Sequence, residues 1–279
     1  MIKSYCKINL SLRIIKKLNN GLHDIQSNSV LINLYDEIKI KMIKKKYDVI
    51  TFNGKFKKDV NIKKNSIMNT LKLLRSEDLI KKDRFYKILI NKKIPVYSGL
   101  GGGSSNAAFL IKYFVKKNNI KKKLGIFTNK LGSDLRLFFY NQSFQKSLKT
   151  VVKYKNKYKL YFVIIYPNVK CSTKLIYSKV RKFSDTSKIN FVKINHESRF
   201  IELIKKEKND LEMISSSIYP SIKKIISLLS LQEGCYMSRM TGSGSACYGM
   251  FQSQKLAKLG IKKIKKKFPK YWATVTKTI

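Results

Sequence analysis

The segment Pro95–Ala108 has the composition of a loop that binds an anion through its backbone. Four of the five residues between positions 99 and 103 are glycine, which lets a backbone adopt positive φ and approach a ligand closely. Ser104, Ser105 and an apolar run follow, so the pattern predicts a helix whose free N–H groups and positive dipole end face the loop. We interpret the segment as a phosphate-binding loop, with a flexible surface turn as the less favoured alternative.

This loop differs from two common nucleotide-binding motifs. No Lys-Ser or Lys-Thr pair follows the last glycine, so it is not a Walker loop. No preceding parallel strand with an acidic residue about 20 positions further on is evident, so a dinucleotide-binding motif is not indicated. A second glycine-rich segment, Met240–Cys247, carries Gly-Ser-Gly-Ser and has the same capacity to offer N–H groups and hydroxyls to a phosphate.

Two side chains are conspicuous as chemical groups. Asp134 lies between Gly132-Ser133 and an apolar run, in a chain with 16 acidic residues. A carboxylate can take the proton of a hydroxyl that attacks phosphorus, although Asp also caps helices and turns. His23 is one of two histidines, and a neutral imidazole suits the edge of a base, although a turn histidine without a ligand fits equally well.

The first loop resembles the phosphate loop of the galactokinase, homoserine kinase, mevalonate kinase and phosphomevalonate kinase superfamily. Its Gly-Gly-Gly-Ser-Ser-Asn-Ala form is similar to the diphosphocytidyl-methylerythritol kinase branch. The resemblance extends over the whole chain. It implies that ATP contacts Pro95, Ser98, Gly99, Leu100, Gly101, Gly102, Gly103, Ser104, Ser105 and Asn106, with Asn65 near the nucleotide.

The same resemblance assigns the catalytic residues. Cys6–Leu10 is similar to an Ala-Lys-Ile-Asn-Leu strand of this branch, which implies a catalytic-site role for Lys7 and a substrate contact for Asn9. Spacing alone does not distinguish Lys7 from the many other lysines. The segment around Asp134 resembles Leu-Gly-Ala/Ser-Asp-Val-Pro-Phe-Phe, which makes Asp134 the catalytic carboxylate and places Arg136 where Pro is usual.

Gly21–Ser27 resembles the family's Gly-Tyr-His-Glu-Leu-Gln-Ser/Thr, which implies that His23 reads the cytosine edge of the substrate. Leu22 stands where Tyr is usual and offers an apolar contact without a π face. Cys171–Tyr177 resembles a further substrate segment. The resemblance implies substrate contacts for Leu22, Thr173, Tyr177, Thr241, Gly242, Ser243 and Gly244, with Tyr177 as an aromatic wall for the base.

Asn209–Glu212 resembles an Asn-Asp-Leu/Phe-Glu helix start, which we interpret as structural, with Asn209 or Asp210 as a cap. The resemblance as a whole implies phosphorylation of the 2-hydroxyl of 4-diphosphocytidyl-2-C-methyl-erythritol, with ATP and Mg²⁺ and no metal ligands from the protein. The alternatives are a kinase of the same superfamily for homoserine or a mevalonate-type alcohol, and a non-enzymatic nucleic-acid binder.

Composition gives weaker expectations. The formal net charge is +44, but lysine occurs in nearly every segment, which favours compositional drift over a nucleic-acid or membrane-surface partner. The four cysteines form no Cys-x-x-Cys pair and are expected to be free thiols in a reducing cytoplasm. We expect a cytoplasmic monomer or weak homodimer with a small-molecule substrate, no nucleic acid and no membrane partner.

The elements that must position these residues suggest an α+β fold with two lobes and an active site in the cleft between them. The expected domains are residues 1–155, which bind ATP, and residues 156–279, on the substrate side. Strands are predicted within 1–15, 29–42, 47–52, 86–90, 159–166 and 246–251. Helices are predicted at 65–74, 104–115, 173–180, from 209, at 222–231 and at 254–267.

Overall fold

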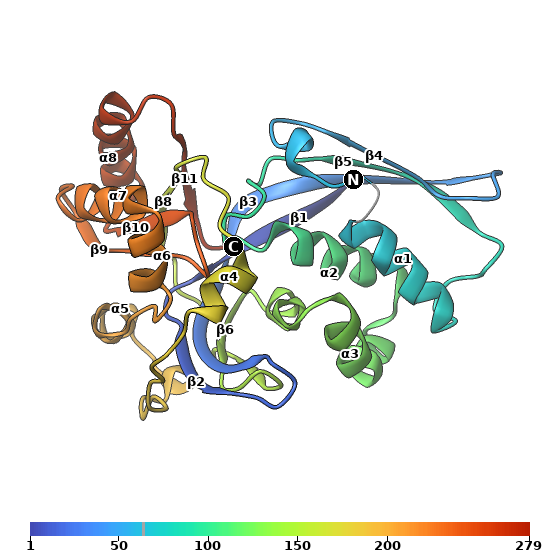
Figure 1. Cartoon of the computed structure of the whole chain (residues 1–279), viewed down its shortest axis with the longest axis horizontal. Coiled ribbons are helices and arrows are strands. Elements are labelled where there is room, and N and C mark those ends of the chain that lie inside the picture. The colour runs from blue at the N-terminus through green and yellow to red at the C-terminus, as the bar shows by residue number, and fades with distance from the viewer. Residues whose placement is uncertain (63–64) are drawn as a thin grey trace. The chain divides into compact units, whose positions relative to one another are not determined.

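The computed structural model describes residues 1–62 and 65–279 (Figure 1). It contains two compact units, each made of interleaved segments. The first unit comprises Met1–Cys6, Leu34–Val96 and Gly101–Phe139, and the second comprises Lys7–Asn33, Tyr97–Leu100 and Tyr140–Ile279. Both units combine helices with β-sheet, so the α+β prediction is confirmed. The single domain boundary expected between residues 155 and 156 stays a prediction.

The first unit combines helices with a short mixed β-sheet. Strand β5 pairs antiparallel with the second part of β3 and parallel with β4. The strands are β1 (Ile2–Asn9), β3 (His23–Ile43), β4 (Val49–Asn53) and β5 (Phe85–Asn91), of which β1 and β3 continue into the second unit. The helices are η1 (Lys57–Asp59), α1 (Ser66–Ser76), α2 (Gly102–Phe114), α3 (Lys117–Leu131) and the 3₁₀ helix η2 (Ser133–Phe139).

Local sequence explains why α1 begins at Ser66. Asn65 has an extended backbone and its side chain accepts a hydrogen bond from the Met68 N–H, which satisfies one of the free donors of the first turn. Ile67, Leu71 and Leu74 recur at helical spacing and are buried, as the sequence predicted.

The second unit contains an antiparallel four-stranded sheet in the order β11-β8-β10-β9. Helices α7 and α8 pack on it (Figure 1). Ile222, Ile225 and Ile264 join Val163 and Ile165 in one core. Its strands are β2 (Arg13–Lys17), β6 (Gln142–Gln145), β7 (Val151–Lys153), β8 (Tyr161–Tyr166), β9 (Cys235–Met240), β10 (Cys247–Phe251) and β11 (Trp272–Lys277). Its helices are α4 (Thr173–Ser178), η3 (Phe191–Lys193), α5 (Glu197–Lys206), α6 (Glu212–Ile218), α7 (Pro220–Ser230) and α8 (Gln254–Lys267).

Every predicted strand and helix has a counterpart, but several boundaries differ. The strand predicted at 29–42 is β3, which begins six residues earlier, at His23. The apolar helix begins at Gly102 instead of Ser104, because Gly101 adopts the left-handed conformation and starts the helix from within the glycine run. The expected strand region 1–15 is two strands with a break at 10–12. The helix predicted from residue 209 begins at Glu212.

Candidate active site

Lys7 lies at the junction between the end of β1 and the first glycine loop, within the second unit. Its side chain is buried, with 2% of the residue exposed. The ammonium donates to the carbonyl oxygen of Gly99 at 2.9 Å and to Oδ1 of Asn9. The Lys7 backbone N–H donates to the Leu100 carbonyl oxygen at 3.1 Å. A buried cation is therefore fixed against the loop backbone.

Asn9 connects this lysine to the second glycine segment. Its Nδ2 donates to Ser27 Oγ at 2.7 Å and to Ser29 Oγ at 3.1 Å, so its Oδ1 is turned towards Lys7. The Asn9 backbone N–H donates to Thr241 Oγ1 at 2.9 Å. Lys7, Asn9 and Thr241, three residues assigned to the site by resemblance, are thus brought together.

The two glycine segments touch through their backbones. Gly99 has a φ of +79°, and a methyl group added there would lie 2.1 Å from the Thr241 carbonyl oxygen. Gly242 has a φ of +57°, and a methyl group there would lie 2.9 Å from the Gly99 carbonyl oxygen and 3.2 Å from Lys7 Nζ. The Ala246 N–H donates to the Ser98 carbonyl oxygen at 3.0 Å. No side chain larger than hydrogen fits at Gly99 or Gly242 without displacing backbone.

The rest of the first glycine loop belongs to the first unit and begins α2. Ser105 donates to the Tyr5 carbonyl oxygen at 2.6 Å, and Asn106 accepts from Ser4 Oγ at 2.9 Å. These side chains hold α2 to β1, and the Ser105 N–H donates to the Gly101 carbonyl oxygen at 2.8 Å. The N–H groups left free for a phosphate are therefore those of the first turn, before Ser105. The N–H groups and positive dipole end of a helix start are suited to an anion.

A buried ion pair that the sequence reasoning missed supports this helix start. Lys92 donates to Asp36, and both side chains are almost completely buried. Oδ1 of Asp36 also accepts from the N–H groups of Lys93 and Ile94, at 2.8 and 3.0 Å. A methyl group added at Gly102 would lie 3.5 Å from Lys92 Nζ. The pair fixes the segment that enters the loop and places a positive charge beside the first turn of α2.

Asp134 lies in η2 of the first unit, after Gly132 has ended α3. Lys112 of α2 donates to the Phe138 carbonyl oxygen at 2.6 Å and lies 4.4 Å from the Phe109 ring. Burial lowers the pKa of Lys112 to about 8. The helix that starts at the glycine loop therefore also holds the 3₁₀ helix that carries Asp134.

Arg136, which stands where the family usually has Pro, directs its guanidinium to the end of α3. Its Nη2 donates to Thr128 Oγ1 at a long 3.5 Å. The substitution therefore adds a contact between η2 and α3 within the first unit.

An aromatic cluster surrounds His23 in the second unit. The ring centroids of His23 and Tyr177 are 5.2 Å apart, and those of His23 and Phe183 are 6.4 Å apart. Burial and the charge of Lys17 lower the pKa of His23, so its ring is neutral at pH 7. Phe183 and Leu22 are 50% and 47% exposed, so both side chains are accessible to a ligand. Phe183 was not among the residues expected in the site.

Thr173 connects α4 to the second glycine segment, because its Oγ1 lies 2.9 Å from Ser243 Oγ. The residues expected at the site fall into two sets. The second unit contains Lys7, Asn9, Leu22, His23, Ser98–Leu100, Thr173, Tyr177 and Thr241–Gly244, and the first contains Asn65, Pro95, Gly101–Asn106 and Asp134. Among the residues described, no group of three or more His, Cys, Asp or Glu side chains could hold a metal ion. In the same part of the chain, no helix is long and apolar enough to cross a membrane.

Comparison with known proteins defines the class of this molecule. The family model "GHMP kinases N terminal domain" matches residues 65–131, and "GHMP kinases C terminal" matches residues 191–270. A crystal structure of 4-(cytidine 5'-diphospho)-2C-methyl-D-erythritol kinase is similar at a TM-score of 0.75 and 20% identity, covering 100% of this chain and 99% of that one. A homoserine kinase from Cytophaga hutchinsonii gives a TM-score of 0.68 at 18% identity, covering 100% and 96%. Fold and site together define a kinase of the galactokinase, homoserine, mevalonate and phosphomevalonate type.

Curated relatives narrow the class further. The 4-diphosphocytidyl-2-C-methyl-D-erythritol kinase of Pelagibacter ubique is 37% identical over 100% of this chain and 98% of its own length. The enzyme of the same name from the Wolbachia strain wRi is 32% identical over 100% of both chains. The chain belongs to the 4-diphosphocytidyl-2-C-methyl-D-erythritol kinase family. The family that the sequence motifs indicated is thus confirmed.

Proposed function

We propose that this chain transfers the γ-phosphoryl group of ATP to the 2-hydroxyl of 4-diphosphocytidyl-2-C-methyl-D-erythritol, a step of the methylerythritol phosphate route to isoprenoid precursors. The observation that carries the proposal is the placement of Lys7, a buried ammonium fixed where two glycine segments meet. Such a site suits a phosphorylated ligand, because a fixed ammonium offsets phosphate charge and glycine-rich segments can offer backbone N–H groups to it. The names of the full-length relatives support the choice of substrate.

ATP would bind through the first glycine loop and the start of α2, with the charge of Lys92 close to the first turn. The described residues contain no group of three or more acidic, His or Cys side chains at metal-binding spacing. Mg²⁺ would be bound through the phosphates of ATP together with one or two carboxylates, as is usual in proteins. When bound, Mg²⁺ neutralises charge on the phosphates.

In the proposed chemistry, the oxygen of the 2-hydroxyl attacks the γ-phosphorus, and Asp134 takes the proton of that hydroxyl. The new bond joins that oxygen to phosphorus, and the bond from phosphorus to the β,γ-bridging oxygen breaks to release ADP. Lys7 would offset the negative charge that spreads over the transferred group. Its hydrogen bonds to Gly99 and Asn9 hold the ammonium in one position before the reaction begins.

The ring cluster is proposed to bind the cytosine. The neutral His23 ring supplies one donor and one acceptor for the base edge. Tyr177 supplies one aromatic face, and Phe183 supplies the second face that Leu22 lacks. Half-exposed aromatic side chains grouped in this way are typical of a stacking site for a planar base.

Phe183→Ala should raise the KM for the cytidylyl alcohol about tenfold, because base–aromatic stacking contributes about 1–3 kcal/mol. Its kcat should stay within about twofold, because the ring is assigned to binding and not to the reacting groups. Phe183→Tyr, which keeps the ring, should keep the KM, and Tyr113→Ala, which removes another exposed aromatic side chain, should leave it unchanged. Steady-state kinetics would reject this role if Phe183→Ala bound the alcohol as tightly as the unaltered enzyme.

The proposed function is tested by coupling ADP release to a spectrophotometric assay with separate alcohols. The purified protein should turn over 4-diphosphocytidyl-2-C-methyl-D-erythritol, and homoserine and mevalonate should give rates near the background. Turnover of homoserine or mevalonate without turnover of the cytidylyl alcohol would contradict the proposal and favour another branch of the superfamily.

A further inference from the structure

Three side chains from residues 209–215 hold the backbone of the second glycine segment. Asn209 Nδ2 donates to the carbonyl oxygens of Met240 and Gly242, each at 2.9 Å. The neighbouring contacts are Ser215 Oγ to the Ser243 carbonyl oxygen at 3.1 Å, and the Met240 N–H to Glu212 Oε2 at 2.8 Å. We call Asn209, Glu212 and Ser215 the loop clamp.

The sequence suggested that Asn209 or Asp210 caps a helix, but α6 begins only at Glu212 and its N-cap residue is Leu211. Asn209 accepts from the Leu211 N–H at 3.1 Å, while its amide group is directed at the glycine segment. Asn209 is 4% exposed. A buried amide that bonds two loop carbonyls positions the loop more than it caps the helix.

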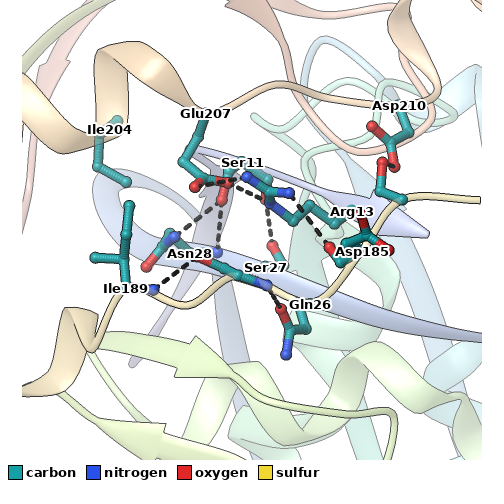
Figure 2. A network of polar contacts seen from close by, with 12 residues as sticks. Ser11, Arg13, Gln26, Ser27, Asn28, Asp185, Ile189, Ile204, Glu207 and Asp210 are labelled. Carbon is teal, nitrogen blue, oxygen red and sulfur yellow. Dashed lines mark hydrogen bonds and ion pairs between the residues drawn. The ribbon is translucent and has the colours of Figure 1, made fainter. Parts of the chain in front are cut away.

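The clamp is itself anchored to the N-terminal strands. Leu12 pairs with this segment, donating to the Lys208 carbonyl oxygen and accepting from the Asp210 N–H, both at 2.9 Å. Glu207 accepts two hydrogen bonds from Arg13, at 2.7 and 3.0 Å (Figure 2). Asn209 is therefore attached to the chain segment that continues from Lys7 and Asn9.

The clamp determines which way one loop peptide points. A trans peptide directs its C=O and its N–H to opposite sides. Because the Gly242 carbonyl oxygen accepts from Asn209, the N–H of Ser243 must point away from Asn209. Glycine at 242 would otherwise let this peptide rotate readily, which would exchange the N–H for a carbonyl oxygen. An N–H attracts a phosphate and a carbonyl oxygen repels it.

We propose that Asn209 is a positioning residue that keeps the Gly242–Ser243 peptide turned with its N–H towards the diphosphate of the substrate, beside Lys7. Ser215 assists by holding the next carbonyl group. This inference rests on the proposed function for the identity of the ligand, whereas the orientation of the loop does not depend on it.

The test compares Asn209→Ala with Gln142→Ala. Gln142 is a matched control: it is 3% exposed, and its carboxamide bonds the backbone of Tyr158 through both its nitrogen and its oxygen, at 2.8 and 3.0 Å. In Asn209→Ala, hydrogen exchange of the 240–245 amides should rise at least tenfold, and the KM for the cytidylyl alcohol should rise about tenfold. The KM for ATP should change less than about threefold. Gln142→Ala should alter neither the exchange of this segment nor the KM.

Ser215→Ala removes one hydroxyl and is a milder variant. Hydrogen exchange of the 240–245 amides and the KM for the cytidylyl alcohol should each rise about threefold. This variant decides the question if Asn209→Ala does not fold. Equal exchange of residues 240–245 in the clamp variants and in Gln142→Ala would overturn the inference, as would an unchanged KM in a variant whose loop exchanges faster. If the unaltered enzyme did not phosphorylate the cytidylyl alcohol, the proposed function would fail, and the exchange comparison would still decide whether the clamp orients the loop.

Discussion

Asp134→Asn is expected to lower kcat by about 10²–10⁴-fold, which is the usual contribution of a positioned general base. The amide keeps the shape of the side chain but cannot accept the proton of the attacking hydroxyl. Because ATP is assigned to the glycine loop and α2, its Kd should change less than about threefold. Steady-state kinetics at saturating substrates and titration calorimetry with ATP measure the two quantities.

Asp78→Asn is the control for this substitution, because Asp78 is an exposed carboxylate whose partner is the exposed Lys82. It should leave both kcat and the Kd for ATP unchanged. Near-normal turnover by Asp134→Asn would contradict the assignment of the base. A Kd for ATP raised in step with the loss of kcat would indicate that Asp134 contributes to nucleotide binding instead.

Gly99→Ala should cost both stability and activity, because the added methyl group would lie 2.1 Å from the Thr241 carbonyl oxygen. That atom belongs to the backbone of the second glycine segment, so relief requires the two segments to separate. Overpacking of this kind costs about 1–3 kcal/mol, in addition to about 1–3 kcal/mol for a side chain at positive φ. We expect kcat/KM to fall by at least about 100-fold, since Lys7 is bonded to the Gly99 carbonyl oxygen.

Gly21→Ala separates the two costs. Gly21 has a φ of +80°, close to the +79° of Gly99, but an added methyl group would meet no atom within 4 Å. Urea unfolding should therefore show the conformational cost alone for Gly21→Ala and a free-energy loss larger by about 1–3 kcal/mol for Gly99→Ala. Equal losses in the two variants would show that the contact between the glycine segments contributes nothing.

Local sequence patterns predicted most of the fold that positions the site. The glycine loop, the helix after it and the helix predicted at 65–74 follow from short-range rules, and all were found. Helix α3 was missed because only Ile120, Phe127 and Thr128 of its fifteen residues are buried, which leaves a weak apolar stripe. Edge strand β11 was missed because its mostly half-buried residues show no clear alternation.

The residues missed at the site depend on contacts distant in sequence. Asn209 donates to carbonyl oxygens 31 and 33 positions away. Every residue type has a backbone carbonyl group, so the sequence does not show which of them accepts a hydrogen bond. Lys92 is one of 60 basic residues, and only its burial against Asp36 distinguishes it. Phe183 does not belong to any motif recognised in the sequence, and its ring is close to that of His23 only in the folded chain. Family resemblance could select Lys7 because it carries information that spacing within one chain does not.

Phosphorylation of the hydroxyl of the cytidylyl alcohol by this chain can be observed in solution. Phosphorus NMR of a reaction that contains the enzyme, ATP, Mg²⁺ and 4-diphosphocytidyl-2-C-methyl-D-erythritol tests it most directly. We expect a new phosphomonoester signal that grows in step with ADP, while the cytidylyl diphosphate linkage stays intact, and Asp134→Asn should suppress that signal. Formation of ADP and inorganic phosphate without a phosphomonoester would contradict it.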